Sequence, residues 1–406
     1  MGIVIRRATL RGESGPKDVK IEGDRIVEIG DRIHGSAERE IDATGRLVTP
    51  GLVNPHLHLD KVLTGHLVNP SNTLEEALKA NRDYLTKYSV DEVKNRVRGV
   101  LESAILHGTT ALRAFVDVDK ACGVSAVQAM LDMKREYREA IDLQITPFVY
   151  DYRVKGNEEL LIKAAEMGSD VIGGVVFLLD NGMSEEECKD YVDRTFSIAK
   201  RFDLDVHMLV DDQEDPNSHL LEYYAIKTIR EGFQGRTTAS HAEGLSVVND
   251  IYASKVISLV KSAGMSICAN GHVNLGRDDI VLSRGNTRVR EFMEAGVNVT
   301  SGQDDVDDFY YPFGIPDMLE IAFMASHLAR LITPEGLEIA LDMVTINGAK
   351  ALRLKDYGLR VGAKADLVVL NAPTVRDALR LRPDRVVIKN GRVVAESRME
   401  QKLFLR

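Results

Sequence analysis

The sequence predicts an α/β protein with a (β/α)8 TIM barrel and a small β-sandwich domain built from both termini. Through the middle of the chain, eight short apolar segments alternate with segments of helical periodicity. Such alternation favours a parallel sheet, and eight units favour a closed barrel. The 406 residues are enough for a barrel of about 250 residues and an accessory domain. We therefore expect β-sandwich segments at 1–47 and 356–406 around a barrel at 48–355.

Both ends of the chain carry the signals of antiparallel strands. Residues 3–10 and 18–30 alternate apolar and polar side chains, with Gly23 in a predicted hairpin turn. Residues 365–372 have the composition of a strand, and residues 385–396 have that of a second hairpin. We infer that the two ends pair into one small sheet domain.

The predicted barrel begins with a buried strand that starts at Val48. Seven further strands are expected at 110–118, 142–149, 171–177, 205–210, 237–241, 265–269 and 297–301. Helices are expected between them at 74–88, 89–107, 125–139, 158–167, 184–202, 219–231, 248–263 and 287–295. Ser89 has the features of a helix N-cap, with Glu92 three residues later as in a capping box.

The first strand ends in two histidines, His56 and His58. Side chains of a strand repeat with a period of two, so both imidazoles point to the same side and can hold one metal ion. The motif is short, and two surface histidines would produce it equally well. The buried strand before it, and further ligand types at later strand ends, favour a metal site.

Chemistry in such barrels takes place at the carboxyl ends of the strands, so polar residues there are the site candidates. Histidine nitrogen and carboxylate oxygen are ligands that Zn²⁺ and Fe²⁺ accept. The candidates for such a shell are His56, His58, His207 and Asp304. Asp304 can also take a proton from water, and His241 can polarise a substrate oxygen. Each histidine alone is also explained as a core or surface residue, but their joint occurrence in barrel order favours a site.

Several stretches of the chain resemble the amidohydrolase superfamily, in the branch of cytosine deaminase and N-isopropylammelide isopropylaminohydrolase. They read PGLVNPHLHLDK, RAFVDVD, DVHMLVDD, TASHAEG, SGQDDVDDFYYPFG, TINGAKAL and DYGLRVGAKADLVVLN. The resemblance implies a metal-dependent hydrolase barrel with ligands His56, His58, His207 and Asp304. It also implies that His241 lies near the leaving group or carbonyl. The fourth strand, VIGGVVFLLD, lacks the lysine that binuclear members carbamylate, so one divalent metal ion, zinc or iron, is expected.

Three positions depart from cytosine deaminase. Val210 stands where that enzyme has its glutamate proton shuttle, and valine cannot transfer a proton. Tyr150 replaces a glutamine that reads the pyrimidine edge, and Phe115 replaces a histidine of the second strand. These changes make cytosine an unsuitable substrate. Asp211, Asp212 or Glu243 can compensate for the lost acid, although each is also explained as a solvated loop carboxylate.

The substrate-binding residues are expected at or beyond the strand ends. They are Lys61, Tyr150, His272 and Asp305. Lys61 follows the His-x-His motif but is also explained as a surface lysine. His272 lies in a loop that borders the pocket in this fold, and Asp305 adjoins the proposed ligand Asp304.

Composition restricts the other classes of function. The net charge of −10 argues against a nucleic-acid surface, which needs clustered basic residues. No apolar run approaches the roughly 18 residues of a membrane span, and the N-terminus reads as a strand and not as a signal peptide. The cysteines Cys122, Cys188 and Cys268 are far apart, as expected for thiols of a reducing cytoplasm. Homo-oligomers are common in the superfamily, so a homo-oligomer is expected.

We therefore expect a cytoplasmic, mononuclear metal-dependent hydrolase that attacks a C–N bond of a small nitrogen heterocycle and releases ammonia or an amine. One alternative is a cyclic amide hydrolase that opens the ring. The absence of an acid at Val210 leaves this alternative possible. The other alternative is a non-catalytic barrel used as a binding scaffold.

Overall fold

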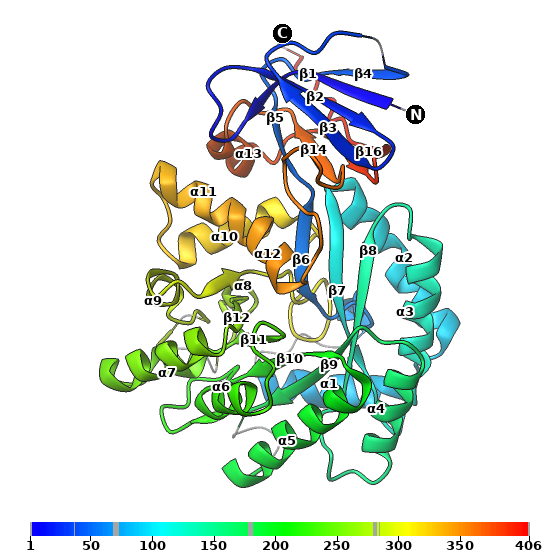
Figure 1. The fold of residues 1–406 in the computed structure, drawn as a ribbon. Helices are drawn as coiled ribbons and strands as arrows, with labels where there is room; N and C mark the ends of the chain where they lie inside the picture. Colours follow the sequence, from blue (N-terminus) through cyan, green and yellow to red (C-terminus); the bar gives the residue numbers. More distant parts are fainter. Residues whose placement is uncertain are drawn as a thin grey trace.

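Two parallel β-sheets form the centre of this computed structural model, which describes residues 2–35, 37–67, 73–177, 182–278, 282–283 and 285–404 (Figure 1). The first sheet has the order β6-β7-β8, and the second has the order β13-β12-β11-β10-β9. Their bounds are β6 (Leu52–Leu57), β7 (Thr109–Asp117), β8 (Asp142–Phe148), β9 (Val171–Val176), β10 (Asp205–Val210), β11 (Thr237–His241), β12 (Ser266–Cys268) and β13 (Asn298–Thr300). All eight predicted strands are present in the predicted order.

Every residue of β6, β7 and β9 is buried, as expected for parallel strands covered on both faces. At one junction of the two sheets, Asp304 N donates to His56 O at 2.8 Å, and His58 N donates to Asp304 O at 2.7 Å. At the other junction, Asp170 N donates to Ile145 O at 3.0 Å, just before β9 begins. The predicted alternation of parallel strands and helices is confirmed, and the sheet edges meet at these two places.

Helices cover the outside of the parallel strands (Figure 1). The longer ones are α1 (Leu74–Leu85), α2 (Val90–Leu106), α3 (Ser125–Glu136), α4 (Asn157–Glu166), α5 (Glu185–Phe202), α6 (Leu220–Arg230) and α7 (Asp250–Ser262). They are followed by α9 (Val289–Glu294), α10 (Met318–Leu328), α11 (Pro334–Met343) and α12 (Ile346–Ala351). Short turns are η1 (Gly65–Leu67), η2 (Glu243–Ser246) and α8 (Gly271–Asn274). The predicted cap is confirmed, because Ser89 Oγ accepts from Glu92 N at 3.2 Å.

Helices α10, α11 and α12 were not among the predicted helices. The segment that forms α10, MLEIAFMASHL, is apolar on most of its faces. It therefore shows no clear 3.6-residue period, which is the signal that reveals an amphipathic helix. Among the described residues, no helix is both long enough and apolar enough to cross a membrane.

The two ends of the chain form one eight-stranded sheet, as predicted. Its order is β16-β15-β14-β5-β1-β2-β3, and β4 pairs with β1. The bounds are β1 (Gly2–Leu10), β2 (Lys17–Glu22), β3 (Arg25–Gly30), β4 (Arg39–Asp42), β5 (Leu47–Pro50), β14 (Leu367–Leu370), β15 (Arg385–Lys389) and β16 (Arg392–Glu396). Helix α13 (Val375–Leu381) connects β14 to β15. Side chains from both ends share a core, in which Ile5 and Val19 cluster with Val369 and Ile388.

The apolar stretch predicted as one strand from Val48 is two strands in the structure. Residues 47–50 pair with β14 and β1 in the terminal sheet, and the parallel strand begins at Leu52. Gly51 lies between them, where an added Cβ would lie 2.1 Å from Thr110 Oγ1. Periodicity cannot reveal this division because both strands are buried throughout. The terminal sheet therefore lies at the end of β6 opposite the two histidines (Figure 1).

Candidate active site

The two histidines at the end of β6 point to the same side, as predicted. Their Nε2 atoms are 3.3 Å apart, and both side chains are buried. Phe115 on β7 supports them, because its ring stacks on His56 with a centroid distance of 4.0 Å and contacts His58 at 5.4 Å. The phenylalanine that departs from the cytosine deaminase pattern therefore fixes the orientation of both imidazoles.

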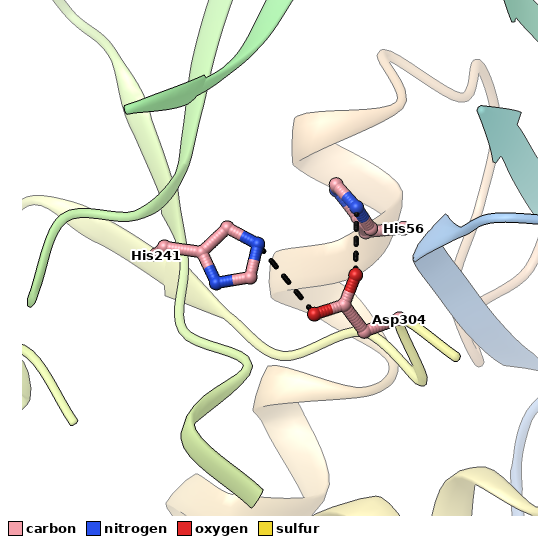
Figure 2. Close-up of side chains that lie close together, drawn as sticks. All are labelled: His56, His241 and Asp304. Atoms are coloured by element: carbon pink, nitrogen blue, oxygen red, sulfur yellow. Dashed lines mark ion pairs between the residues drawn. The ribbon is translucent and has the colours of Figure 1, made fainter. Parts of the chain in front are cut away.

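Asp304 lies between His56 and His241 (Figure 2). Its Oδ1 lies 3.0 Å from His56 Nε2 and 3.7 Å from His58 Nε2, and its Oδ2 lies 3.5 Å from His241 Nε2. Asp304 and His241 both have positive φ, 65° and 69°, a conformation uncommon outside glycine that concentrates at functional sites. Gly302 allows the chain to approach β6, because a Cβ there would lie 2.7 Å from both His56 Cβ and His56 O.

His207 lies beside this group but is held differently. Its ring centroid is 5.3 Å from that of His56, its Nε2 is 2.6 Å from Ser240 Oγ, and Arg113 Nη1 is 3.2 Å from its Nδ1. Ser240 Oγ is also 2.7 Å from His56 Nδ1, so one hydroxyl connects the two rings. Sequence analysis did not single out Ser240 or Arg113, and the role of His207 as a ligand stays a prediction.

The donor set at this site fits a divalent metal ion. Among the described residues, His56, His241 and Asp304 offer ligand atoms within 4.8 Å of one another, as do His58, Asp304 and Asp305. Burial lowers the pKa of His56 and His58, which keeps their nitrogen lone pairs available. Histidine nitrogen with carboxylate oxygen suits zinc or iron better than magnesium or calcium.

His241 is surrounded by carboxyl groups. Asp212 Oδ1 is 3.2 Å and Glu243 Oε1 is 3.7 Å from its Nδ1. Burial lowers the pKa of His241, but Asp212 and Asp304 outweigh burial and raise it to about 10. The Asn274 amide donates to Asp212 at 2.8 Å and to Glu243 at 2.7 Å. Both carboxylates are buried, so their interpretation as solvated loop residues is wrong.

A cavity opens onto this group of residues. Its described lining comprises His58, Leu74, Leu78, Tyr150, Val175, Phe177, Leu209, Asp212, His241, Val273, Asn274, Arg277, Asp304, Asp305 and Tyr310. One side is apolar and belongs to a small cluster formed by residues of α1 and of the neighbouring strands β7 to β10. The other side carries the carboxylates, Asn274 and Arg277. Such a mixed cavity suits a flat ring with polar edges.

The predicted substrate-binding residues separate into two groups. Tyr150 and Asp305 line the cavity, whereas Lys61 and His272 are not among its described lining residues. Lys61 is fully buried behind Tyr150 and bonds to its hydroxyl at 3.0 Å. His272 Nε2 lies 3.0 Å from the carbonyl oxygen of Gln303. The surface alternative for Lys61 is therefore wrong, and the roles of Lys61 and His272 in substrate binding stay predictions.

Sequence analysis missed Leu74, Leu78, Asn274 and Arg277. The two leucines come from α1 and not from the end of a strand. Asn274 and Arg277 follow the seventh strand by several residues. The only sequence signal that could have indicated them is the expected position of this loop beside the pocket.

Residues 67–395 match the Amidohydrolase family, and the chain belongs to that family. N-isopropylammelide isopropyl amidohydrolase of Pseudomonas sp. (strain ADP) is 32% identical over 97% of each chain. The crystal structure of 5-methylcytosine deaminase from Klebsiella pneumoniae liganded with phosphonocytosine superposes with a TM-score of 0.91 and 30% identity, covering 99% of this chain and 100% of that one. The structure of N-isopropylammelide isopropylaminohydrolase from Burkholderia multivorans has a TM-score of 0.86 and 27% identity, covering 98% of each.

These relatives confirm the branch of the amidohydrolase superfamily that the motifs indicated. Pterin deaminase of Rhizobium rhizogenes is similar as well, at 29% identity over 89% of this chain and 84% of that one. The relatives are deaminases and aminohydrolases of nitrogen heterocycles, and the superfamily is metal-dependent. The chain is accordingly a hydrolytic enzyme that acts on C–N bonds.

Proposed function

We propose that this enzyme hydrolyses the bond between a ring carbon and an exocyclic nitrogen of a small heterocycle, releasing ammonia or an amine, with one bound zinc or iron ion. The single observation that supports this most is the position of Asp304, whose two oxygens face the His56–His58 pair and His241 at the cavity. A carboxylate placed between a metal site and a histidine can receive a proton from water and pass it on.

In this proposal, His56, His58, His207 and Asp304 hold the ion. The ion supplies Lewis-acid activation of water at neutral pH. Asp304 accepts the proton that water loses, and returns it to the departing nitrogen. The buried His241, whose Nε2 faces Asp304, would donate from that nitrogen toward the substrate oxygen or nitrogen on which charge develops. The cavity walls orient the ring and exclude competing water.

The substrate is a heterocycle other than cytosine. Val210 is fully buried and cannot take the part of a glutamate proton shuttle. Asp212 lines the cavity beside His241 and can offer a carboxylate to a ring nitrogen. The apolar side of the cavity suits an alkyl substituent on the ring or on the leaving nitrogen. Ring opening of a cyclic amide is the second candidate, because it requires the same attack on an sp² carbon but no exocyclic leaving group.

The architecture around this site is part of the proposal. The two parallel sheets would constitute one closed (β/α)8 barrel spanning 48–355, with segments 1–47 and 356–406 as a β-sandwich. The contacts at both sheet junctions and the shared core of the chain ends support it. A cytoplasmic homo-oligomer is proposed as well. The cysteines Cys122, Cys188 and Cys268 are buried and free, as suits a reducing compartment.

A hydrolysis screen tests the function. The purified chain, assayed for bound metal and supplied with Zn²⁺ or Fe²⁺, is incubated with amino- and alkylamino-substituted pyrimidines, triazines and pterins and with cyclic amides. Ammonia, amine and ring-opened product are followed separately. We expect release of ammonia or amine that Asp304→Asn lowers at least about a hundredfold, while Asp307→Asn, which lies outside the described cavity lining, retains activity. Ring opening alone would assign the second candidate, and a metal-free, inactive chain would contradict both.

A further inference from the structure

The two ring nitrogens of His241 face different groups of carboxyl oxygens. Nε2 lies 3.5 Å from Asp304 Oδ2, in the proposed metal centre. Nδ1 lies 3.2 Å from Asp212 Oδ1 and 3.7 Å from Glu243 Oε1, which take no part in that centre. Among the described residues, Asp212, His241 and Glu243 offer one ligand atom each, and these atoms lie within 4.8 Å of one another. The imidazole therefore separates the proposed centre from a second group of possible metal ligands.

Two buried atoms of this second group have no hydrogen-bond partner in the described part of the chain. They are His241 Nδ1 and Glu243 Oε2, and they belong to side chains that are 2% and 1% exposed. The nitrogen is close to Asp212, but the two groups do not have the geometry of a hydrogen bond. A buried polar atom without a partner is destabilising, so each one in a folded protein needs an explanation. One bound cation would provide a partner for both atoms.

The charges of this group also favour a cation. Asp212 and Glu243 are both buried, and a buried carboxylate requires a compensating charge. The Asn274 amide donates to both, at 2.8 Å and 2.7 Å, but it carries no net charge. Arg277 Nη1 lies 3.4 Å from Asp212 Oδ1 and supplies one positive charge. A proton on His241 Nδ1 supplies one more, whereas a divalent ion in its position supplies two, so the carboxylates attract the ion more strongly.

We propose that His241 Nδ1, Asp212 and Glu243 form a second divalent-cation site, which takes an ion such as Zn²⁺ in the position of the Nδ1 proton. One imidazole nitrogen with carboxylate oxygens suits Zn²⁺, Mn²⁺ or Fe²⁺, whereas Mg²⁺ prefers oxygen ligands alone. The ion reaches the site through the cavity, because Asp212 and His241 are among its lining residues. The site is weaker than the proposed catalytic centre, because the charge of Arg277 repels the ion.

Occupation of this second site acts on catalysis without removal of the catalytic ion. The second ion takes the Asp212 carboxylate and lies on the polar side of the cavity. Excess zinc should therefore inhibit the enzyme in competition with its substrate. The inference goes beyond the proposed function, which needs one ion and only Nε2 of His241.

Zinc titration of the full chain tests the inference without a substrate. The chain is loaded with one equivalent of Zn²⁺ and is then titrated with more Zn²⁺ in a calorimeter, where we expect a second, weaker equivalent to bind. Glu243→Gln and Asp212→Asn should each weaken the second equivalent at least about a hundredfold and leave the first in place, since even an indirect partner of a metal ligand is worth about 10- to 100-fold in affinity. Excess Mg²⁺ should not compete for the second site.

Asp211→Asn is the matched control. Asp211 is a buried aspartate next to Asp212 in the sequence, but its carboxylate accepts from the Ser218 hydroxyl, and it belongs to none of the groups of possible ligands among the described residues. This variant should bind both equivalents as the wild type does. Anomalous scattering from zinc-soaked crystals should place the second ion beside His241 Nδ1.

The two proposals fail in different ways. A single equivalent that Glu243→Gln retains, a second equivalent that this variant leaves unchanged, or a second ion located elsewhere would overturn the inference. A single equivalent that Glu243→Gln abolishes would support the second site and would contradict only the catalytic centre of the proposed function.

Discussion

Asp211 should make the stability of this enzyme depend on pH in a direction opposite to that of an ordinary salt-bridged aspartate. Its side chain is 5% exposed, and it accepts a hydrogen bond from the Ser218 hydroxyl. Burial raises its pKa to about 7, whereas an aspartate of an unfolded chain titrates near about 3.9. Between these values the folded chain keeps a proton that the unfolded chain has released. The stabilisation is therefore complete below about pH 4 and is lost as the pH rises to about 7.

The magnitude follows from the width of this window. Each pH unit within it lowers the free energy of unfolding by about 1.4 kcal/mol, so the loss between pH 4.5 and 6.5 is about 3 kcal/mol. Asp211→Asn stays neutral at all these values and removes the dependence. Asparagine also suits the backbone, because residue 211 has a φ of 52°. Other buried carboxyl groups with raised pKa values, such as Asp60 and Asp305, titrate alike in the wild type and in Asp211→Asn. Their contributions therefore cancel when the two free energies of unfolding are subtracted.

Urea unfolding of the wild type and Asp211→Asn across pH 4.5 to 8 measures this difference. The stability of the variant relative to the wild type should rise by about 3 kcal/mol from pH 4.5 to 6.5 and then level off above about pH 7.5. Two curves that run parallel across the whole range would refute the reasoning, since they would show that residue 211 releases its proton equally in both states. A relative gain by the wild type would show that the carboxylate is stabilised in the fold.

Three further outcomes test the metal site. Gly302→Ala should reduce bound metal and activity at least about tenfold, because its Cβ would meet His56 at 2.7 Å, whereas Gly276→Ala, with no atom within 4 Å, should not. Emission spectrometry of the purified variants measures the metal content. Ser240→Ala should weaken metal affinity about 10- to 100-fold, measured by competition with a chelator, because His56 loses the hydroxyl that orients its ring. Chelation of the wild type should lower the melting temperature, and returning the ion at about 100 times Kd should restore about 3 kcal/mol of stability.

The strand ends were predictable because strands and ligands follow simple periodic rules. The bounds of β10 and β11 match the predicted 205–210 and 237–241, and the Nε2 atoms of His56 and His58 meet as a period of two requires. Each of these expectations depends only on local spacing and on the rule that parallel strands end at one edge.

The surroundings of the site could not be predicted in the same way. Burial of Lys61, Asp212 and Glu243 depends on partners more than thirty residues away, such as Asp117 and Asn274, and charged residues are usually exposed. The direction in which His207 turns depends likewise on Ser240. Such contacts are fixed by tertiary packing, and no pattern within the segment itself records them.

The junction between His56 and Asp304 has a consequence for how the polypeptide acquires its activity. The two residues lie 248 positions apart, yet their main chains bond directly to each other. The terminal sheet repeats this arrangement, because β5 pairs with β14. A growing chain on the ribosome therefore cannot assemble the site until residue 304 has emerged, and it cannot complete its accessory sheet until almost all of the chain is made. A product truncated before residue 304 lacks the Asp304 contact and is therefore expected to be inert.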